Sequence, residues 1–297
     1  MVKPSPNMIG VLLAATGFLF YAIGDIGFKN AVMQLTVYQV AFYAQAIGLI
    51  FLVAYSVFSK KSLKTKKVKL HVMRAIFIAV PYFIAIYAFQ HKSLAEAYIF
   101  FSLAPFFTGI FASILLKEHF TKHQFFAVLT GFIGVTIILR PGFVEIDWIA
   151  VAIIIASISY AYISVVTRRD GEGESELVLS FYVTLGIFLL SIIPFLFDPV
   201  IPPSNLYLSL VVAGSFEAVA TGLVSLAYLK TRAVTIQKLG YTGLVWAYFL
   251  GWIFFDDYLI DGWTLTGAVI IVSSGLYMIY REHRFSQRQQ EKEALET

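Results

Sequence analysis

The chain has no cysteine among its 297 residues, and this absence excludes a disulfide framework and any thiolate metal site. Its five histidines never form a His-Glu-x-x-His or similar grouping, so we predict neither a metal centre nor another cofactor. A G-x-x-x-x-G-K-[ST] phosphate loop is also missing, which excludes direct use of ATP through such a loop. Charged residues are scarce at 13%, about half the share of a soluble domain. These deficits point away from soluble enzymes.

What the sequence has in excess is apolar character, at 59% of all residues. The apolar residues fall in runs of roughly 18–22 with short polar breaks, and about 20 helical residues cross a hydrocarbon core of about 30 Å. The predicted fold class is therefore all-α and integral to the membrane. Ten transmembrane helices are expected, over residues 8–28, 36–58, 72–91, 95–116, 122–140, 147–167, 176–197, 206–229, 233–255 and 262–281.

Lysine and arginine are distributed unequally over the two sides that ten alternating helices would create. Of the 22 basic residues, 18 fall on one side and three on the other, while Lys238 lies inside a predicted helix. Because cytoplasmic loops are enriched in Lys and Arg, we assign the basic side, and with it both termini, to the cytoplasm of a cell inner membrane or plasma membrane. The densest cluster, Lys60 to Lys69, is interpreted as a solvated topology determinant that also contacts anionic lipid.

Two segments about 140 residues apart resemble each other. Residues 114–121 and 253–260 each end an apolar run in a polar turn, and the apolar run that follows contains two glycines and ends in arginine, at Arg140 and Arg281. Five helices per half would insert the halves in opposite senses, an arrangement found in secondary transporters. We therefore predict a five-helix repeat over residues 1–142, an inverted second repeat over 143–283 and a cytoplasmic tail over 284–297.

The first half also carries a family pattern: a proline in the fourth predicted helix, a turn with a carboxylate after it, two glycines in the fifth helix and an Arg-Pro-Gly exit. These are Pro105, Lys117-Glu118-His119-Phe120-Thr121, Gly131, Gly134 and Arg140-Pro141-Gly142. The pattern resembles the drug/metabolite transporter superfamily, in particular its EamA-type ten-helix members. The resemblance implies a central cavity between helices 1, 3, 4, 6, 8 and 9, with helices 5 and 10 packed together. The sequence departs from that family at Leu244-Val245, where a proline matching Pro105 is common, and in lacking the arginine common in helix 2.

Four ionisable residues fall inside predicted spans, where such groups are costly and therefore usually functional: Asp25, Glu96, Glu217 and Lys238. Glu217 stands out because three further polar residues share its helix face, at spacings of 4, 8 and 11: Thr221, Ser225 and Tyr228. A polar stripe of this kind should face a wet cavity or a polar partner.

Each of these ionisable residues also has a structural interpretation. Glu217 would pair with Lys238 on the next helix, or Lys238 would extend to the cytoplasmic interface. Asp25 would pair with Lys29, one turn further on. Glu96 would stabilise the positive N-terminal end of its own helix. Sequence alone leaves both interpretations open for all four residues.

The expected function is secondary transport by alternating access, in which the two halves rock about a cavity. Because that cavity would combine several carboxylates, one lysine and many aromatic rings, we expect a small cationic or zwitterionic metabolite as substrate. An amino acid or a derivative of one fits this description, with an S-adenosylmethionine-like solute among the candidates. The candidates for proton coupling are Glu217, Glu96 and Asp25. The expected substrate-binding residues are Glu217, Lys238, Tyr241, Trp246, Glu96, Tyr82, Tyr160, Thr221, Ser225 and Tyr98.

Two other functions fit the composition less closely. A lipid or lipid-precursor flippase of the same fold would need a lateral opening and a strongly apolar cavity wall. A membrane-embedded enzyme would need paired aspartates or a His–Ser cluster at one depth, and no predicted span contains either. The expected partners are a small solute and the lipid bilayer, with no nucleic acid, and the chain is expected to act as a monomer or a homodimer.

Overall fold

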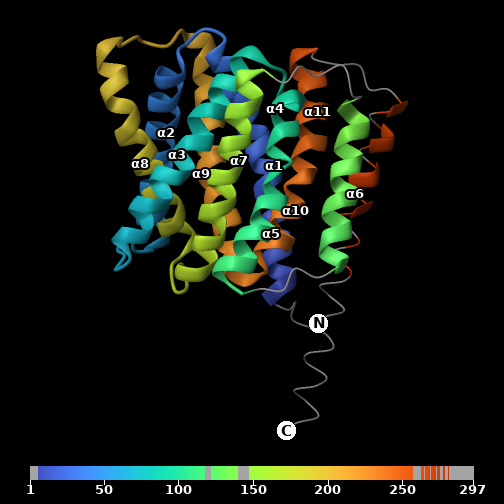
Figure 1. Cartoon of the computed structure of the whole chain (residues 1–297). Helices are drawn as coiled ribbons and strands as arrows, with labels where there is room; N and C mark the ends of the chain where they lie inside the picture. Colours follow the sequence, from blue (N-terminus) through green and yellow to red (C-terminus); the bar gives the residue numbers. More distant parts are fainter. Residues whose placement is uncertain are drawn as a thin grey trace.

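A computed structural model describes residues 6–117, 122–139 and 147–256, together with residues 262, 263, 265–267, 269–271, 273, 274, 277 and 280. All regular elements in this part of the chain are helical, and the long helices stand side by side with nearly parallel axes (Figure 1). In chain order they are α1 (Pro6–Val32), α2 (Val37–Ser59), α3 (Val68–His91), α4 (Leu94–Phe101), α5 (Ala104–Leu115), α6 (Lys122–Leu139), α7 (Trp148–Asp170), α8 (Glu176–Phe197), the 3₁₀ helix η1 (Ser204–Leu206), α9 (Tyr207–Lys230), α10 (Ala233–Leu239) and α11 (Tyr241–Phe255).

Seven helical segments are long and apolar enough to cross a membrane. They are α1 from Met8, α2, α3, α4 with α5, α7, α8, and α9 with the short helix before it. The predicted all-helical fold with multiple segments of spanning length is confirmed for the described residues. The count of ten spans and the inverted repeat stay predictions. The turns at Glu118 and Asp257, the exit at Arg140 and the tail from residue 284 lie outside the described residues.

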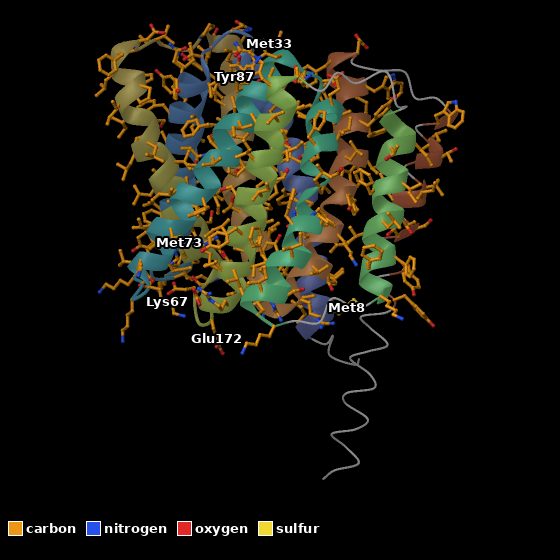
Figure 2. All side chains as sticks on the ribbon, in the orientation of Figure 1. Met8, Met33, Lys67, Met73, Tyr87 and Glu172 are labelled. Carbon is orange, nitrogen blue, oxygen red and sulfur yellow. The ribbon has the colours of Figure 1, made fainter. Side chains whose placement is uncertain are left out.

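The two ends of the bundle differ in which side chains they present. Met8, Lys67 and Glu172 lie at one end, whereas Met33 and Tyr87 lie at the other (Figure 2). We call the first the basic end, because it includes the lysine-rich loop over residues 60–67. The helices α1 and α3 therefore both run from the basic end to the opposite end, as the predicted alternation requires.

The lysine-rich loop packs on the loop between α7 and α8. The Lys61 Nζ atom lies 2.5 Å from Glu176 Oε1, and this hydrogen bond raises the pKa of the Lys61 amine. The Lys67 amine donates to the carbonyls of Asp170 and Glu172 at 2.8 and 2.6 Å. Lys61 and Lys67 thus contact the protein itself, whereas the sequence predicted that the whole cluster from Lys60 to Lys69 contacts solvent and lipid.

The span expected over residues 95–116 is broken into α4 and α5. The two helices meet at Ser102 and Leu103, and Pro105 follows in the first turn of α5. A proline has no N–H to donate, and in a continuous helix its ring would clash with the carbonyl of Phe101. The chain instead makes tighter turns, in which the Leu103 N–H donates to the Phe100 carbonyl at 3.3 Å.

The span expected over residues 233–255 is broken in a similar way, into α10 and α11. The break falls at Gly240, whose N–H donates to the Gln237 carbonyl at 3.0 Å, the i to i+3 pattern of a 3₁₀ turn. Glycine weakens a helix interior because it has the most conformational freedom to lose. Both breaks lie near the middle of the bundle, where they expose irregular backbone.

An antiparallel contact between α1 and α9 sets the depth of the most important polar residues. A Cβ on Gly27 would lie 2.3 Å from the Ser209 carbonyl oxygen, so the two backbones nearly touch. One turn earlier, a Cβ on Gly24 would lie 3.5 Å from the backbone nitrogen of Glu217. Asp25 on α1 and Glu217 on α9 are therefore at the same depth.

The helix α6 packs against described residues of the last predicted helix, as the family resemblance implies. The Ser274 hydroxyl donates to the Ala127 carbonyl at 2.8 Å. Gly134 leaves room for the Gly267 carbonyl, which an added Cβ would approach to 2.9 Å. This pair stands at one edge of the bundle (Figure 1) and leaves the centre to the other helices.

Candidate functional site

A cavity of about 160 Å³ lies inside the bundle, between α1, α3, α4, α5, α7, α9, α10 and α11. These helices correspond to the predicted spans 1, 3, 4, 6, 8 and 9, the set that the family resemblance places around a central cavity. Both helix breaks contribute to the wall, with Ser102 and Pro105 from one and Gln237 and Gly240 from the other. Irregular backbone at membrane depth is tolerated where it lines a cavity of this kind.

Two carboxylates line the cavity at one depth, Asp25 from α1 and Glu217 from α9. The Tyr98 hydroxyl donates to Asp25 Oδ2 at 2.5 Å. Glu217 accepts no hydrogen bond from the part of the chain that the structure describes. The described lining residues include no lysine, arginine or histidine. The ionisable groups among them are the two carboxylates and the tyrosine hydroxyls.

Aromatic rings form much of the remaining wall. The rings of Phe28 and Tyr82 meet edge to face, with their centroids 5.5 Å apart. Aromatic faces attract cations through their quadrupole and also stack on flat ring systems. Nine of the twenty lining residues are aromatic: Phe18, Tyr21, Phe28, Tyr82, Phe89, Tyr98, Phe101, Tyr160 and Tyr241.

Glycines on neighbouring helices make room for two of these tyrosines. A Cβ on Gly243 would lie 2.6 Å from the Tyr98 ring, and one on Gly131 would lie 2.5 Å from the Tyr241 ring. Real Cβ atoms do not approach other atoms so closely, so both positions need glycine for the tyrosines to stay where they are. Gly131, which the sequence offered only as part of a family pattern, thus has a physical role behind the cavity wall.

The predicted polar stripe on α9 is divided in the structure. Only Glu217 lines the cavity. One turn further, Thr221 hydrogen-bonds the Tyr21 hydroxyl at 3.1 Å. Next, Ser225 accepts a hydrogen bond from Arg74 at 2.6 Å. The last member, Tyr228, donates its hydroxyl hydrogen to the Gln237 side chain. The stripe therefore faces a cavity at its start and polar partners beyond it.

The structure brings six of the residues named from sequence together in the cavity wall and leaves the others out of it. Those in the wall are Asp25, Tyr82, Tyr98, Tyr160, Glu217 and Tyr241. Glu96 instead completes a capping box with Ser93, each side chain accepting the other residue's backbone N–H at 3.1 Å. Lys238 is buried without lining the cavity, and Trp246, Thr221 and Ser225 are also outside the lining. The structural interpretation of Glu96 is thus realised.

Sequence reasoning missed the position of Arg74, which it counted only among the 18 basic residues of the cytoplasmic side. Its side chain is 1% exposed and donates to the Thr167 hydroxyl at 3.0 Å, the Leu179 carbonyl at 2.7 Å and the Ser225 hydroxyl at 2.6 Å. A signal was present, because Arg74 falls within the apolar run predicted over residues 72–91. A charge inside such a run is costly and therefore usually functional, and this rule applies to Arg74 as it does to the carboxylates.

Known proteins resemble this chain in sequence and in fold. A model of the EamA-like transporter family matches residues 8–140. The S-adenosylmethionine uptake transporter of Rickettsia prowazekii is 26% identical over 265 residues, which cover 89% of this chain and 90% of the relative. The pseudopaline exporter CntI of Pseudomonas aeruginosa is 24% identical over 266 residues, which cover 89% and 93%. A solved crystal structure covers 90% of this chain and 96% of its own, with a TM-score of 0.73 at 18% identity, and so supports the fold.

The fold, the cavity and these relatives agree. Helices of membrane-spanning length surround a cavity whose wall comes from both halves of the chain. The named relatives match over nearly their whole lengths and carry transporter names. The chain is therefore a transporter rather than an enzyme, and the match of residues 8–140 to the EamA-like transporter family, together with these relatives, supports a transporter of the drug/metabolite transporter superfamily.

Proposed function

We propose that this transporter carries a small cationic or zwitterionic organic metabolite across the inner or plasma membrane by alternating access. Glu217 and Asp25 bind the cationic group. The observation that carries the proposal is that these two carboxylates lie at one depth in an aromatic cavity, with no basic side chain among the described lining residues.

The chemistry of Glu217 favours a cation. A carboxylate has about four acceptor positions, and this one accepts no hydrogen bond from the described residues. An ammonium group supplies up to three donors, and charge-assisted hydrogen bonds are about twice as strong as neutral ones. A neutral or anionic solute would leave the carboxylate without compensation in an apolar surrounding, which is unfavourable.

The aromatic wall favours a substrate with a ring or a soft cation. Tyr82, Tyr98, Tyr160 and Tyr241 line the cavity from four different helices. A sulfonium or quaternary nitrogen is attracted to ring faces, and a flat heterocycle stacks on them. Amino acids and their derivatives are the class proposed, with S-adenosylmethionine the first compound to test because one relative is named for its uptake.

The two helix breaks support a transport cycle between inverted halves. Ser102 and Gly240 interrupt helices at comparable places, about 140 residues apart, and both interruptions line the cavity. Broken helices in corresponding positions of two repeats typically mark the binding site of secondary transporters. Rocking of one half against the other would then expose the carboxylates to each side in turn.

Uptake into proteoliposomes tests the proposal. Radiolabelled amino acids, S-adenosylmethionine, matched amines and neutral ring compounds are compared, each with and without a pH gradient. Cationic and zwitterionic solutes should show saturable uptake, and Glu217→Gln should reduce it at least tenfold, since a charge-assisted contact is lost. Stimulation by a pH gradient that disappears in Glu217→Gln would assign proton coupling to this residue.

Glu172→Gln is the matched control, because Glu172 is exposed at the basic end (Figure 2) and its substitution should leave uptake unchanged. Size-exclusion profiles and melting temperatures show that each variant is folded. Full activity of folded Glu217→Gln would remove Glu217 from the mechanism. Transport restricted to anions or neutral solutes would contradict the proposed substrate class.

A further inference from the structure

Arg74 is a buried cation whose hydrogen-bond acceptors are all neutral. It lies in the first part of α3, is 1% exposed, and donates to two hydroxyls and one carbonyl on α7, α8 and α9. A guanidinium has five N–H groups, so these three bonds leave two N–H groups that they do not use. No carboxylate hydrogen-bonds to Arg74 within the described residues.

The acidic residue on the loop side of Arg74 is engaged elsewhere. Glu174 lies 3.4 Å from the His71 ring nitrogen and accepts a hydrogen bond from the Thr65 hydroxyl at 2.8 Å. Burying a charge without an opposite charge in contact is costly, and an apolar side chain of similar volume would pack at that position with less penalty. A buried arginine with neutral partners therefore keeps a charge that an anionic group from outside the protein could compensate.

Arg74 lies between the cavity and the basic end. It is one turn nearer to the basic end than Ile78, the lining residue of α3 closest to that end. Its partner Ser225 is eight residues beyond Glu217 on α9, or about 12 Å along the helix. Between Glu217 and the basic end lie three hydrogen-bonded pairs, which we call the polar layer: Tyr21–Thr221, Arg74–Ser225 and Tyr228–Gln237.

We propose that Arg74 is a second substrate subsite, which binds the carboxylate of a zwitterionic metabolite when the polar layer opens toward the basic end. The inference rests on the proposed function and narrows it, because it requires that the substrate carry both a cationic group and a carboxylate. Opening of the layer frees the guanidinium from the Ser225 and Thr167 hydroxyls. A carboxylate then replaces them with two parallel charge-assisted hydrogen bonds, the geometry for which arginine is best suited.

Because of their spacing, the two subsites bind the substrate one after the other. The ammonium and carboxylate of an amino acid head group are much closer together than the roughly 12 Å between the levels of Glu217 and Ser225. The cationic group is therefore held at Glu217 while the cavity is closed to the basic end. The carboxylate reaches Arg74 only as that side opens, so the arginine draws the substrate from one side of the layer to the other.

Matched pairs of compounds that differ only in a carboxylate test this inference. Uptake of S-adenosylmethionine is compared with that of decarboxylated S-adenosylmethionine, and tyrosine with tyramine, in proteoliposomes containing the full chain. The wild-type protein should prefer the carboxylated member at least tenfold in kcat/KM. Arg74→Gln should bring this ratio close to one by lowering uptake of the carboxylated member, and Arg74→Lys should retain part of the preference.

Arg169→Gln is the matched control, because Arg169 is exposed on α7 and pairs with Asp170 at 2.8 Å. It should leave the ratio unchanged. Equal wild-type uptake of both members would overturn the Arg74 subsite while leaving cation transport in place. Uptake of neither member of any pair would overturn the proposed function and the subsite with it.

An equal loss of both members in folded Arg74→Gln would show that Arg74 only stabilises the closed layer, and this also overturns the subsite. The preference of the wild-type protein for the carboxylated compound is measured without any variant. Together with the result for Arg74→Lys, it tests the Arg74 subsite even where Arg74→Gln does not fold.

Discussion

At the scale of single residues, three carboxylates of the same kind occupy different surroundings. The local sequence around Glu96 indicates its position better than the presence of a carboxylate does. Asp25, Glu96 and Glu217 are all carboxylates within apolar runs, but only Asp25 and Glu217 line the cavity. Glu96 follows Ser93 by three residues at a helix start, which is the signature of a capping box, and the structure contains that box. The signal for this structural role was therefore readable in the sequence, beside the general rule that intramembrane carboxylates are functional.

The roles of Thr221 and Ser225 could not be read from the same stripe, because periodicity gives a face and not its partner. Both residues lie on the face of Glu217, as predicted, but their hydroxyls contact Tyr21 and Arg74. The opposing side chains come from α1 and α3, about 200 and 150 positions away in the sequence. Only the packed structure shows where along α9 the cavity ends.

A prediction at this scale concerns Gly131. Its substitution by alanine places a methyl group where the Tyr241 ring now lies, at 2.5 Å, so the ring must move toward the cavity that it lines. We expect the KM for ring-bearing substrates to rise about tenfold in Gly131→Ala, while smaller substrates are less affected. The measurement is uptake kinetics in proteoliposomes.

The double variant Gly131→Ala with Tyr241→Ala removes the obstructing ring and should restore part of the lost affinity. Gly262→Ala is the matched control, because a Cβ at Gly262 meets no atom of the described residues within 4 Å. A KM that is the same in Gly131→Ala and wild type would mean that the ring is not held against α6 in the working protein.

At the scale of helices, the existence of the elements was predictable and their continuity was not. Long apolar runs separated by short polar breaks predicted the helices, since the run length is set by the membrane. The breaks inside two of them depend on weaker signals. Pro105 was identified as part of a family pattern, although its missing N–H also predicts a helix boundary. Gly240 is one of twenty glycines in the chain, so its presence alone does not mark a helix break.

The contact between α2 and α9 yields a stability prediction. A Cβ on Gly214 would lie 2.1 Å from the Ala44 carbonyl oxygen, and a backbone atom cannot be moved as easily as the end of a side chain. We expect Gly214→Ala to destabilise the protein by about 1–3 kcal/mol, the usual cost of overpacking a tight interface. The melting temperature in detergent should fall accordingly, whereas that of Gly262→Ala should not. An unchanged melting temperature would show that the helices separate at this point without penalty.

The ends of α3 and α7 are joined by an ion pair that gives a pH prediction. Lys92 Nζ lies 3.0 Å from Asp147 Oδ2, and the Ala150 N–H followed by the Lys92 amine lowers the pKa of Asp147. Because the folded pKa is below the unfolded one, this stabilisation is present above the unfolded value of about 3.9 and is lost as the pH falls through the folded value.

Wild type should therefore melt slightly above Asp147→Asn at neutral pH, and the difference should vanish in acid. Asparagine is itself a good N-cap, so the comparison isolates the charge. The pair is partly exposed, at 11% for the Lys92 side chain and 34% for the Asp147 side chain, so added salt should screen it and narrow the difference in melting temperature at neutral pH. A difference that grows in acid would contradict the assignment.

At the scale of the whole molecule, the missing cysteines allow a direct test of the predicted topology. Because the native chain has no thiol, a single introduced cysteine is the only labelling site. Cysteines at Ser62 and Glu172 should react with a membrane-impermeant maleimide only from the cytoplasm, and cysteines at Met33 and Ile201 only from outside, since cytoplasmic loops are the basic ones. The measurement compares intact cells with inverted vesicles. Labelling of Ser62 and Met33 variants from the same side would contradict the helix alternation.

The all-helical fold with several segments of membrane-spanning length follows from the sequence, because its strongest constraint, the membrane, is visible in the length of the apolar runs. What the sequence did not contain is the state of the molecule in the transport cycle. The polar layer, with Arg74–Ser225 among its hydrogen-bonded pairs, lies between Glu217 and the basic end. The proposed alternating-access cycle requires that this layer open at some stage, if a substrate bound at Glu217 is to reach that end.

Ser164 on α7 provides a probe of that opening. Its side chain is 3% exposed, lies beside the Tyr228 hydroxyl of the polar layer and donates to the Tyr160 carbonyl of its own helix at 2.7 Å. Cysteine is of similar size, so its introduction should disturb the packing little. Ser164→Cys should resist the maleimide in the resting protein. During turnover with a transported solute it should react from the basic end, at a rate several-fold above that seen without solute, while Ser62→Cys reacts equally under both conditions. Because a buried thiol can be labelled only if the helices around it separate, solute-independent protection of Ser164→Cys would mean that the substrate leaves the cavity by another route and that the polar layer is permanent structure.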